Sequence, residues 1–204
     1  MTKIASAEVI EKLDDPSLKL LFEGARTHNV WQERTVSDSI LGSLFDLMKM
    51  APTSMNISPA RIIFIKTKAG KERLKPALLA GNLEKTMTAP ICAIIGHDLE
   101  CWQQLPKLFP LKDMRGLFRD NPDFAQSTAF RNGSMQGAYF IMAARALGLD
   151  CGPMSGFNNE LVDKEFFAST KVKANFLCNL GYGVLEKLSD RAPRFSFDDV
   201  CQIV

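Results

Sequence analysis

The segment APTSMNISPA, residues 51–60, leads almost directly into the apolar run IIFI at residues 62–65. Its prolines, Pro52 and Pro59, fix φ and stiffen the chain, so the segment is expected to be a loop. The Ser, Thr and Asn side chains between the prolines carry hydroxyl and amide groups that remain free to bind a polar ligand. The apolar run that follows is typical of a buried strand. This order predicts a polar binding loop followed by a core strand.

Arg26 and His28 lie in the segment ARTHN, residues 25–29. One short expected helix separates this segment from the loop. Arg26 follows a helical segment that Gly24 is expected to end, and a guanidinium presents a fork of donors that suits phosphate. Taken alone, the two residues are more typical of a solvated helix end.

A second basic cluster lies in the tail segment KLSDRAPRF, residues 187–195. A basic tail that proline interrupts can fold back onto the domain, where Lys187, Arg191 and Arg194 would complete a phosphate site with Arg26. A solubilising C-terminal surface explains the tail alone equally well. The two clusters together favour an anion site.

Length and composition fit one folded domain with a substantial core. The chain has 204 residues, 46% of them hydrophobic and 24% charged, which is ordinary for a globular protein. Its 25 basic and 23 acidic residues leave a net charge of +2. No overall field favours nucleic acid or an acidic membrane as a partner, so an anion site must be local.

The five cysteines, Cys92, Cys101, Cys151, Cys178 and Cys201, are scattered and odd in number. They form no disulfide framework, which indicates a reducing compartment. We see no signal peptide and no apolar run long enough for a membrane span. The sequence therefore predicts a cytoplasmic protein without a membrane partner.

Hydrophobic spacing predicts helices and buried strands in alternation, which favours a three-layer α/β arrangement. The expected helices are residues 5–24 (broken near Pro16), 37–50, 69–79, 124–149 and 161–167, and the expected strands are 61–67, 90–96, 149–152 and 176–182. Ser37 is expected to cap the second helix, with Ile40, Leu44, Leu47 and Met48 as its buried stripe. Residues 80–85 are expected to be a connector. The irregular region 97–123 is more typical of local core than of a substrate lid, and both readings stay open.

Several common catalytic patterns are absent. The only histidines, His28 and His97, have no metal-ligand spacing, and Ser155 lies outside a G-x-S-x-G elbow. Gly70-Lys71 lacks the glycines of a P-loop, and Glu186 stands where a dinucleotide fingerprint beginning at Gly181 would need its third glycine. Any nicotinamide must therefore visit a site built around another cofactor.

Four segments together resemble the FMN-dependent nitroreductase superfamily along nearly the whole chain, and its malonic semialdehyde reductase branch in particular. They are residues 25–29, residues 52–61, AFRN at residues 129–132 and GPMSGF at residues 152–157. The resemblance implies a single α+β domain, residues 1–204, with a mostly antiparallel sheet between helices, an intertwined homodimer and two FMN molecules between its subunits.

The resemblance also implies where FMN binds. Arg26, His28 and Arg191 would hold the phosphate, and the partner subunit would contribute Pro52, Thr53, Ser54 and Asn56. Asn82 and Lys85 would meet the ring and ribityl chain, and Pro153, Met154, Ser155 and Gly156 would cover the ring. Lys85 would stabilise negative charge at the pyrimidine edge of reduced flavin; an ordinary exposed lysine is the alternative. No protein residue is expected to act as the catalytic acid or base.

Three positions depart from the pattern of well-studied nitroreductases. Those enzymes have glutamate in place of Ser155, lysine in place of Val30 and a lysine near Ser189. The changes bear on the phosphate contacts and on which hydride donor or acceptor the flavin accepts.

The implied activity is a ping-pong reduction in which NADH or NADPH reduces FMN and a small aldehyde then takes its place. Malonic semialdehyde, reduced to 3-hydroxypropionate, is the expected acceptor. A broad nitro or quinone reductase is the alternative enzyme, and a non-catalytic flavin-binding dimeric scaffold is the alternative of another class.

Overall fold

The computed structural model describes residues 12–204, so the part of the expected first helix at residues 5–11 lies outside the described residues. Four strands form one sheet in the order β1-β2-β4-β3, with every neighbouring pair antiparallel. The strands are β1 Ala60–Ile65, β2 Ile91–Asp98, β3 Asp150–Met154 and β4 Val172–Gly181. The expected α+β class with an antiparallel sheet is confirmed.

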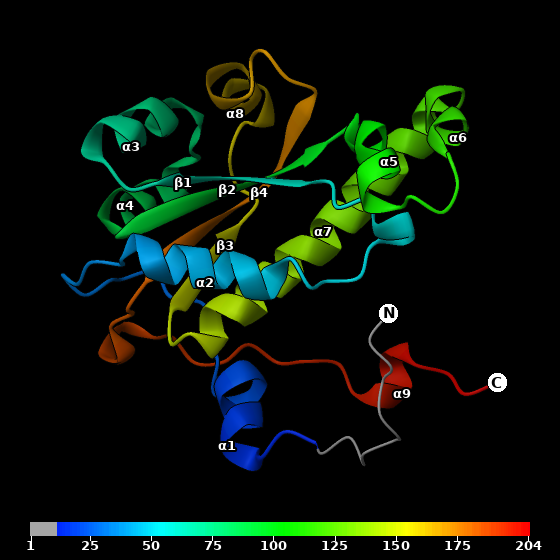
Figure 1. Ribbon diagram of the computed structural model, residues 1–204. Helices are drawn as coiled ribbons and strands as arrows, with labels where there is room; N and C mark the ends of the chain where they lie inside the picture. Colours follow the sequence, from blue (N-terminus) through cyan, green and yellow to red (C-terminus); the bar gives the residue numbers. More distant parts are fainter. Residues whose placement is uncertain (1–11) are drawn as a thin grey trace.

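Helices cover both faces of this sheet, which confirms the three layers (Figure 1). The helices on one face are α2 Asp38–Met48 and α7 Pro122–Ala146. Those on the other face are α3 Lys68–Leu74, α4 Ala80–Thr88 and α8 Asn159–Phe166. A separate hydrophobic cluster fills each interface, one around Leu44 and Phe140 and the other around Leu74 and Val162.

Side-chain caps start three of these helices where the local sequence supplies an oxygen. Ser37 Oγ accepts the Ile40 N–H at 3.3 Å, Thr67 Oγ1 accepts the Gly70 N–H at 3.0 Å, and Asn158 Oδ1 accepts the Leu161 N–H at 3.0 Å. The buried stripe of α2 consists of Leu41, Leu44 and Met48, whereas Leu47 is exposed. The prediction that Leu47 is buried was wrong, because the helix is rotated so that Leu41 faces the sheet.

Two predicted boundaries were also wrong. Residues 80–85 belong to α4 and not to a connector, because tertiary contacts hold a segment whose first turn contains Gly81. Strand β3 continues through Pro153 to Met154. Proline is tolerated there because β3 is an edge strand and needs no second row of ladder hydrogen bonds.

The irregular region after β2 folds as a compact addition. It contains a 3₁₀ turn at Cys101–Gln104, α5 Leu105–Leu108 and α6 Arg115–Arg119. Its buried residues Leu105 and Phe118 pack with Ile57 of the polar loop and with Ala129 of α7. The region is thus a third small core built against the loop.

The remaining elements lie near the ends of the chain or between the larger elements. They are α1 Asp15–Leu18, a π-helical turn at Lys19–Glu23, 3₁₀ turns at Ser54–Asn56, Lys75–Ala77 and Leu185–Lys187, and α9 Phe197–Val200. Residues 12–14 are not helical and α1 begins at Asp15 with Pro16 in its first turn, which agrees with the break expected near Pro16. Gly24 ends the π-helical turn, as expected. Within residues 12–204, no helix is long and apolar enough to cross a membrane.

The central helix α7 lies close to the sheet because glycines face it. A Cβ on Gly133 would stand 2.8 Å from His97 Cβ, and a Cβ on Gly137 would overlap the ring of Phe176. Gly42 on α2, in contrast, has open space around it.

We expect Gly133→Ala to lower the free energy of unfolding by about 1–3 kcal/mol, since His97 Cβ is close to the backbone and cannot move aside. Gly42→Ala should raise it by about 0.5–1 kcal/mol, because alanine favours an exposed helix position. Urea unfolding of both variants measures the difference. Equal effects would show that α7 does not depend on this close contact.

Candidate functional site

The basic tail folds back onto the segment that contains Arg26. Residues 22–30 and 184–194 line a common cavity of about 450 Å³, into which Arg145 also reaches. Its cationic side chains come from Arg26, Arg145, Lys187, Arg191 and Arg194. The two basic clusters of the sequence therefore meet in one place, which we call the basic cavity.

Two arginines connect the walls of the basic cavity. Arg26 donates a hydrogen bond to the carbonyl of Ser189. Arg191 donates in the opposite direction, to the carbonyls of Glu23 at 2.6 Å and Ala25 at 3.0 Å. A guanidinium carries five N–H donors, so each arginine keeps donors that these contacts do not use.

His28 lines this cavity and is only 2% exposed. Its Nε2 lies 3.3 Å from Asp150 Oδ1, and Asp150 Oδ2 accepts the Gly183 N–H at 2.8 Å. Gly183 must be glycine here, since a Cβ would overlap the imidazole ring. Asp150 thus ties His28 to the end of β4. No local pattern distinguishes this aspartate, so it was not among the predicted site residues.

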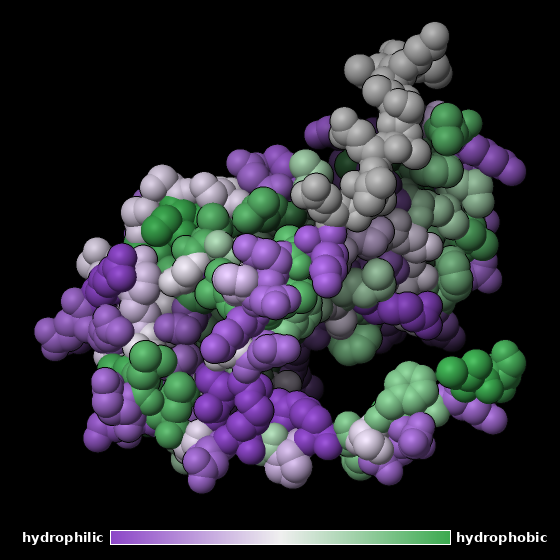
Figure 2. Space-filling view, turned by 90° about the horizontal axis from the view of Figure 1, so that it is seen from below, coloured by the Kyte–Doolittle hydropathy of each residue, from purple (hydrophilic) through white to green (hydrophobic). Residues whose placement is uncertain are grey.

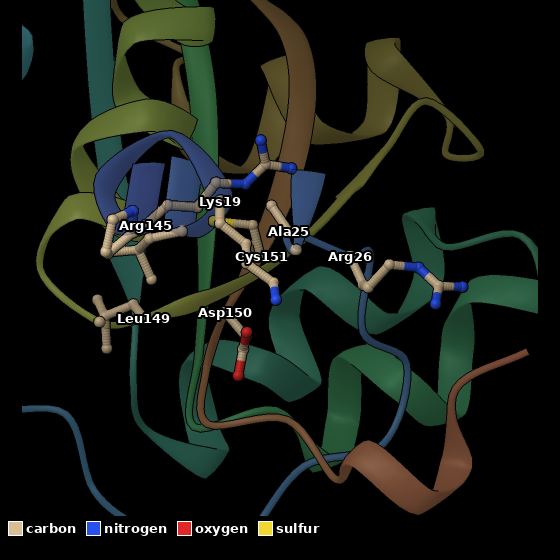
Figure 3. Close-up of a pocket in the computed structure, with 11 residues that line it drawn as sticks. Lys19, Ala25, Arg26, Arg145, Leu149, Asp150 and Cys151 are labelled. Atoms are coloured by element: carbon tan, nitrogen blue, oxygen red, sulfur yellow. The ribbon is translucent and has the colours of Figure 1, made fainter. Parts of the chain in front are cut away.

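A second cavity of about 420 Å³ adjoins the basic cavity and shares Ala25, Arg26 and Arg145 with it. Lys19, Leu149, Asp150 and Cys151 also line it (Figure 3). In this view the Arg26 side chain points away from Asp150 and Leu149. Arg145 donates to the carbonyl of Leu21 at 3.1 Å, so it supports the wall between the two cavities.

Lys85 lines a third cavity, of about 410 Å³, at the other side of the basic cavity. The two share Asn29 and Val30, and Trp31, Gly81 and Glu84 complete the wall around Lys85. The basic cavity and the cavity around Lys85 are therefore adjacent and meet at residues 29 and 30.

Buried donors hold the turn of α4 that carries Lys85. Trp31 Nε1 donates to the Lys85 carbonyl at 3.0 Å, and Asn179 Nδ2 donates to the same oxygen at 3.2 Å. At the end of the helix, the Lys71 ammonium donates to the carbonyls of Met87, at 3.1 Å, and Ala89. Burial lowers the pKa of Lys71. Trp31, Lys71 and Asn179 were not among the predicted site residues, because no local pattern marks them as supports of α4.

The start of α4 is tied to the segment after β3. Asn82 Nδ2 donates to the Gly156 carbonyl at 2.8 Å, and the Leu79 N–H donates to the same oxygen at 3.2 Å. The Asn82 amide nitrogen is thus occupied within the chain. Met154 is buried in the core and only Ser155 of this segment is exposed, so the Met154 side chain does not line the candidate site.

Pro52, Thr53, Ser54 and Asn56 lie far from these cavities within one chain. They follow α2, which is 11 residues long, at the end of the sheet opposite α4 (Figure 1). An α-helix rises about 1.5 Å per residue, so α2 spans about 16 Å. One copy of the chain does not bring these residues to Arg26 or Lys85.

Burial also changes the proton affinity of groups outside the cavities. It lowers the pKa of His97, and it raises the pKa of Cys92 and of Cys101 to about 12. These cysteines remain protonated thiols at neutral pH and cannot serve as thiolate nucleophiles.

Comparison with known proteins identifies the family. Residues 25–182 match the model of the nitroreductase family. A curated relative from Cupriavidus pinatubonensis, which carries the name NADH dehydrogenase/NAD(P)H nitroreductase, is 53% identical over 189 residues, covering 91% of this chain and 96% of the relative. The chain therefore belongs to the nitroreductase family.

Solved structures show the same fold at low sequence identity. The nitroreductase ydfN of Bacillus subtilis superposes with a TM-score of 0.85 at 20% identity, covering 93% of this chain and 99% of that one. A nitroreductase of Exiguobacterium sibiricum, solved in complex with FMN, gives a TM-score of 0.80 at 16% identity, covering 95% and 99%. At sequence identities of 20% and 16%, these similarities show a shared fold alone.

Proposed function

We propose that the chain is an FMN-dependent NAD(P)H oxidoreductase. The observation that carries this proposal is the junction of the basic cavity with the cavity around Lys85. A flavin mononucleotide has a phosphate at one end and a ring that gains negative charge on reduction at the other. The relative with an NAD(P)H nitroreductase name and the related fold that holds FMN support the same reading.

The residues present fit FMN. Arg26 and Arg191 would hold its phosphate with the donors that their carbonyl contacts leave free, and His28 would support the floor. Lys85 would lie at the pyrimidine edge of the ring, with Asn82 Oδ1 and the Pro153–Gly156 segment nearby. When bound, FMN supplies hydride transfer between a nicotinamide and a second substrate. The protein supplies position and positive charge.

A second copy of the chain would complete the site in the proposed homodimer. Pro52, Thr53, Ser54 and Asn56 would reach a flavin held by the other copy, since they lie far from the cavities of their own. Exposed apolar side chains supply a surface for that copy: Phe45 on α2 and Met50 just after it, Phe130, Met135 and Tyr139 on α7, and Phe195, Phe197, Val200, Ile203 and Val204 in the tail. The end of the tail projects from the body as a hydrophobic arm (Figure 2).

The proposed acceptor is malonic semialdehyde, which would be reduced to 3-hydroxypropionate while NADH or NADPH is oxidised and a proton is taken up from water. Reduction of nitro compounds or quinones is the second candidate, favoured by the name of the curated relative. A flavin-binding scaffold without activity is the third.

One preparation distinguishes these candidates. The purified protein should be yellow, and anaerobic NADH or NADPH should bleach it; a yellow protein that neither nucleotide bleaches would be a scaffold. Turnover of malonic semialdehyde should then exceed turnover of a neutral nitroarene. The reverse order would assign the nitroreductase activity.

Removing either of the two arginines proposed to hold the phosphate should weaken the binding of FMN more than the binding of riboflavin. We expect Arg26→Ala and Arg191→Ala each to lose about 2–3 kcal/mol of FMN binding, the scale of charge-assisted hydrogen bonds. Riboflavin lacks the phosphate, so its weaker binding should change little in either variant. Arg119→Ala, which removes an exposed arginine beside Asp120, is the control. Equal loss of FMN and riboflavin would assign the arginines to folding of the tail.

Lys85 should affect the reduced flavin more than the oxidised one. Lys85→Met retains most of the apolar stem but deletes the charge, so we expect the midpoint potential to fall by some tens of millivolts, where about 30 mV corresponds to about 1.4 kcal/mol. Reduction by NADH should slow while oxidised FMN remains bound. Lys68→Met, on an exposed position of α3, is the control. A potential and a reduction rate equal to those of the parent would make Lys85 an ordinary surface lysine.

A further inference from the structure

Two buried amide side chains of α7 hold the polar turn at residues 53–60 by its two ends. The Ser54 N–H donates to Asn132 Oδ1 at 2.8 Å, and the Ala60 N–H donates to Gln136 Oε1 at 2.9 Å. Asn132 and Gln136 are each 4% exposed. They lie four residues apart, about one helical turn, and so project from the same side of α7.

The turn between these anchors has an unfavourable backbone conformation. Met55, Asn56 and Ser58 have φ values of 51°, 53° and 44°, in the left-handed region that costs non-glycine residues of order 1 kcal/mol or more each. Such a conformation persists only where its surroundings enforce it. The hydrogen bonds at both ends of the turn provide that enforcement.

Further contacts fix the interior of the turn. Thr53 Oγ1 accepts the Ser58 N–H at 3.1 Å, and Arg61 donates to the Ser58 carbonyl at 3.1 Å. Asn56 Nδ2 donates to the carbonyl of Leu108 at 2.9 Å, while Ile57 is buried in the core of the 97–123 region. The turn therefore has one conformation, supported from α7 and from that region.

Asn132 is itself held in place. Its Nδ2 donates to the Thr128 carbonyl at 2.8 Å, one turn earlier on α7, which orients Oδ1 toward Ser54. An apolar residue of similar size at position 132 would leave the Ser54 N–H without this acceptor. A half-buried donor that loses its only protein acceptor costs free energy unless the turn moves to expose it.

Ser54 and Asn56 of the turn are exposed, as is Pro52 just before it, whereas Thr53 is turned inward by its contact with Ser58. We propose that Asn132 and Gln136 are positioning residues that hold this surface in the shape that binds the ring and ribityl part of a flavin carried by a second copy of the chain. The claim that this surface binds flavin rests on the function proposed above. The claim that α7 fixes the conformation of the turn does not depend on that function.

The test compares Asn132→Leu, Asn132→Asp and the control Asn175→Leu in the full chain. Asn132→Leu removes the acceptor for Ser54, and Asn132→Asp retains an oxygen at that place. Asn175→Leu removes another partly buried amide against α7, whose Nδ2 donates to Ser134 Oγ at 2.9 Å, without touching the turn. Flavin dissociation constants and amide hydrogen exchange at Ser54 are measured for each protein, together with unfolding in urea.

We expect Asn132→Leu to raise the dissociation constants of FMN and of riboflavin by the same factor, about tenfold, because the turn would contact the ring and ribityl chain that the two flavins share. Exchange at Ser54 should accelerate. Asn132→Asp keeps an acceptor for Ser54 but loses the donor to the Thr128 carbonyl, so it should restore both properties only in part. Asn175→Leu should leave both near the parent values even where it lowers stability. This pattern differs from that of Arg26→Ala, which should affect FMN alone.

Three results would overturn the proposal: parent-like flavin binding in Asn132→Leu, equal losses in Asn132→Leu and Asn175→Leu, or a loss confined to FMN. A parent protein that binds no flavin would refute the proposed function, and exchange at Ser54 would then decide whether α7 holds the turn. If Asn132→Leu does not fold, Gln136→Met removes the acceptor at the other end, and the same measurements apply.

Discussion

The close contact between α7 and the sheet is the constraint on which both halves of the candidate site depend. Gly133 and Gly137 allow the helix to lie against His97 and Phe176 without a side chain between them. At this distance Asn132 and Gln136 can reach the backbone of the polar turn. At the other end of the helix, Gly148, with φ of +75°, turns the chain into β3 and brings Asp150 to His28. One helix thus joins the turn to the basic cavity.

Hydrogen bonds from side chains to backbone carbonyls determine much of the rest of the site. Trp31 and Asn179 hold the carbonyl of Lys85, Lys71 holds the end of α4, and Arg26 and Arg191 join the tail to residues 23–26. Unpaired polar groups are costly where water is excluded, so the partly buried contacts at α4 leave that helix little freedom. The arginine contacts of the tail are exposed to solvent. Lys85, Arg26 and Arg191 thus line the cavities from segments that these contacts hold.

The fold could be predicted from the sequence wherever the pattern was local. The cap at Ser37 and the apolar runs of β1, β2 and β4 identify several elements, because a cap or a buried strand depends on neighbouring residues. The local sequence did not indicate that residues 80–85 are helical or that Leu47 is exposed. In both cases the outcome depends on contacts with distant segments, such as the Gly156 carbonyl at the start of α4.

The sequence by itself determined the layered arrangement of helices about a sheet, the stiffness of the loop between Pro52 and Pro59, and the two basic clusters. These properties follow from covalent restrictions, side-chain charge and short-range spacing. Only the tertiary structure decided that the clusters share a cavity, that Met154 is buried and that Asp150, Asn132 and Gln136 support the site. The physical reason is that each of these roles requires a hydrogen bond or packing contact between residues far apart in the chain, such as Ser54 and Asn132, and nothing in either local sequence specifies its partner.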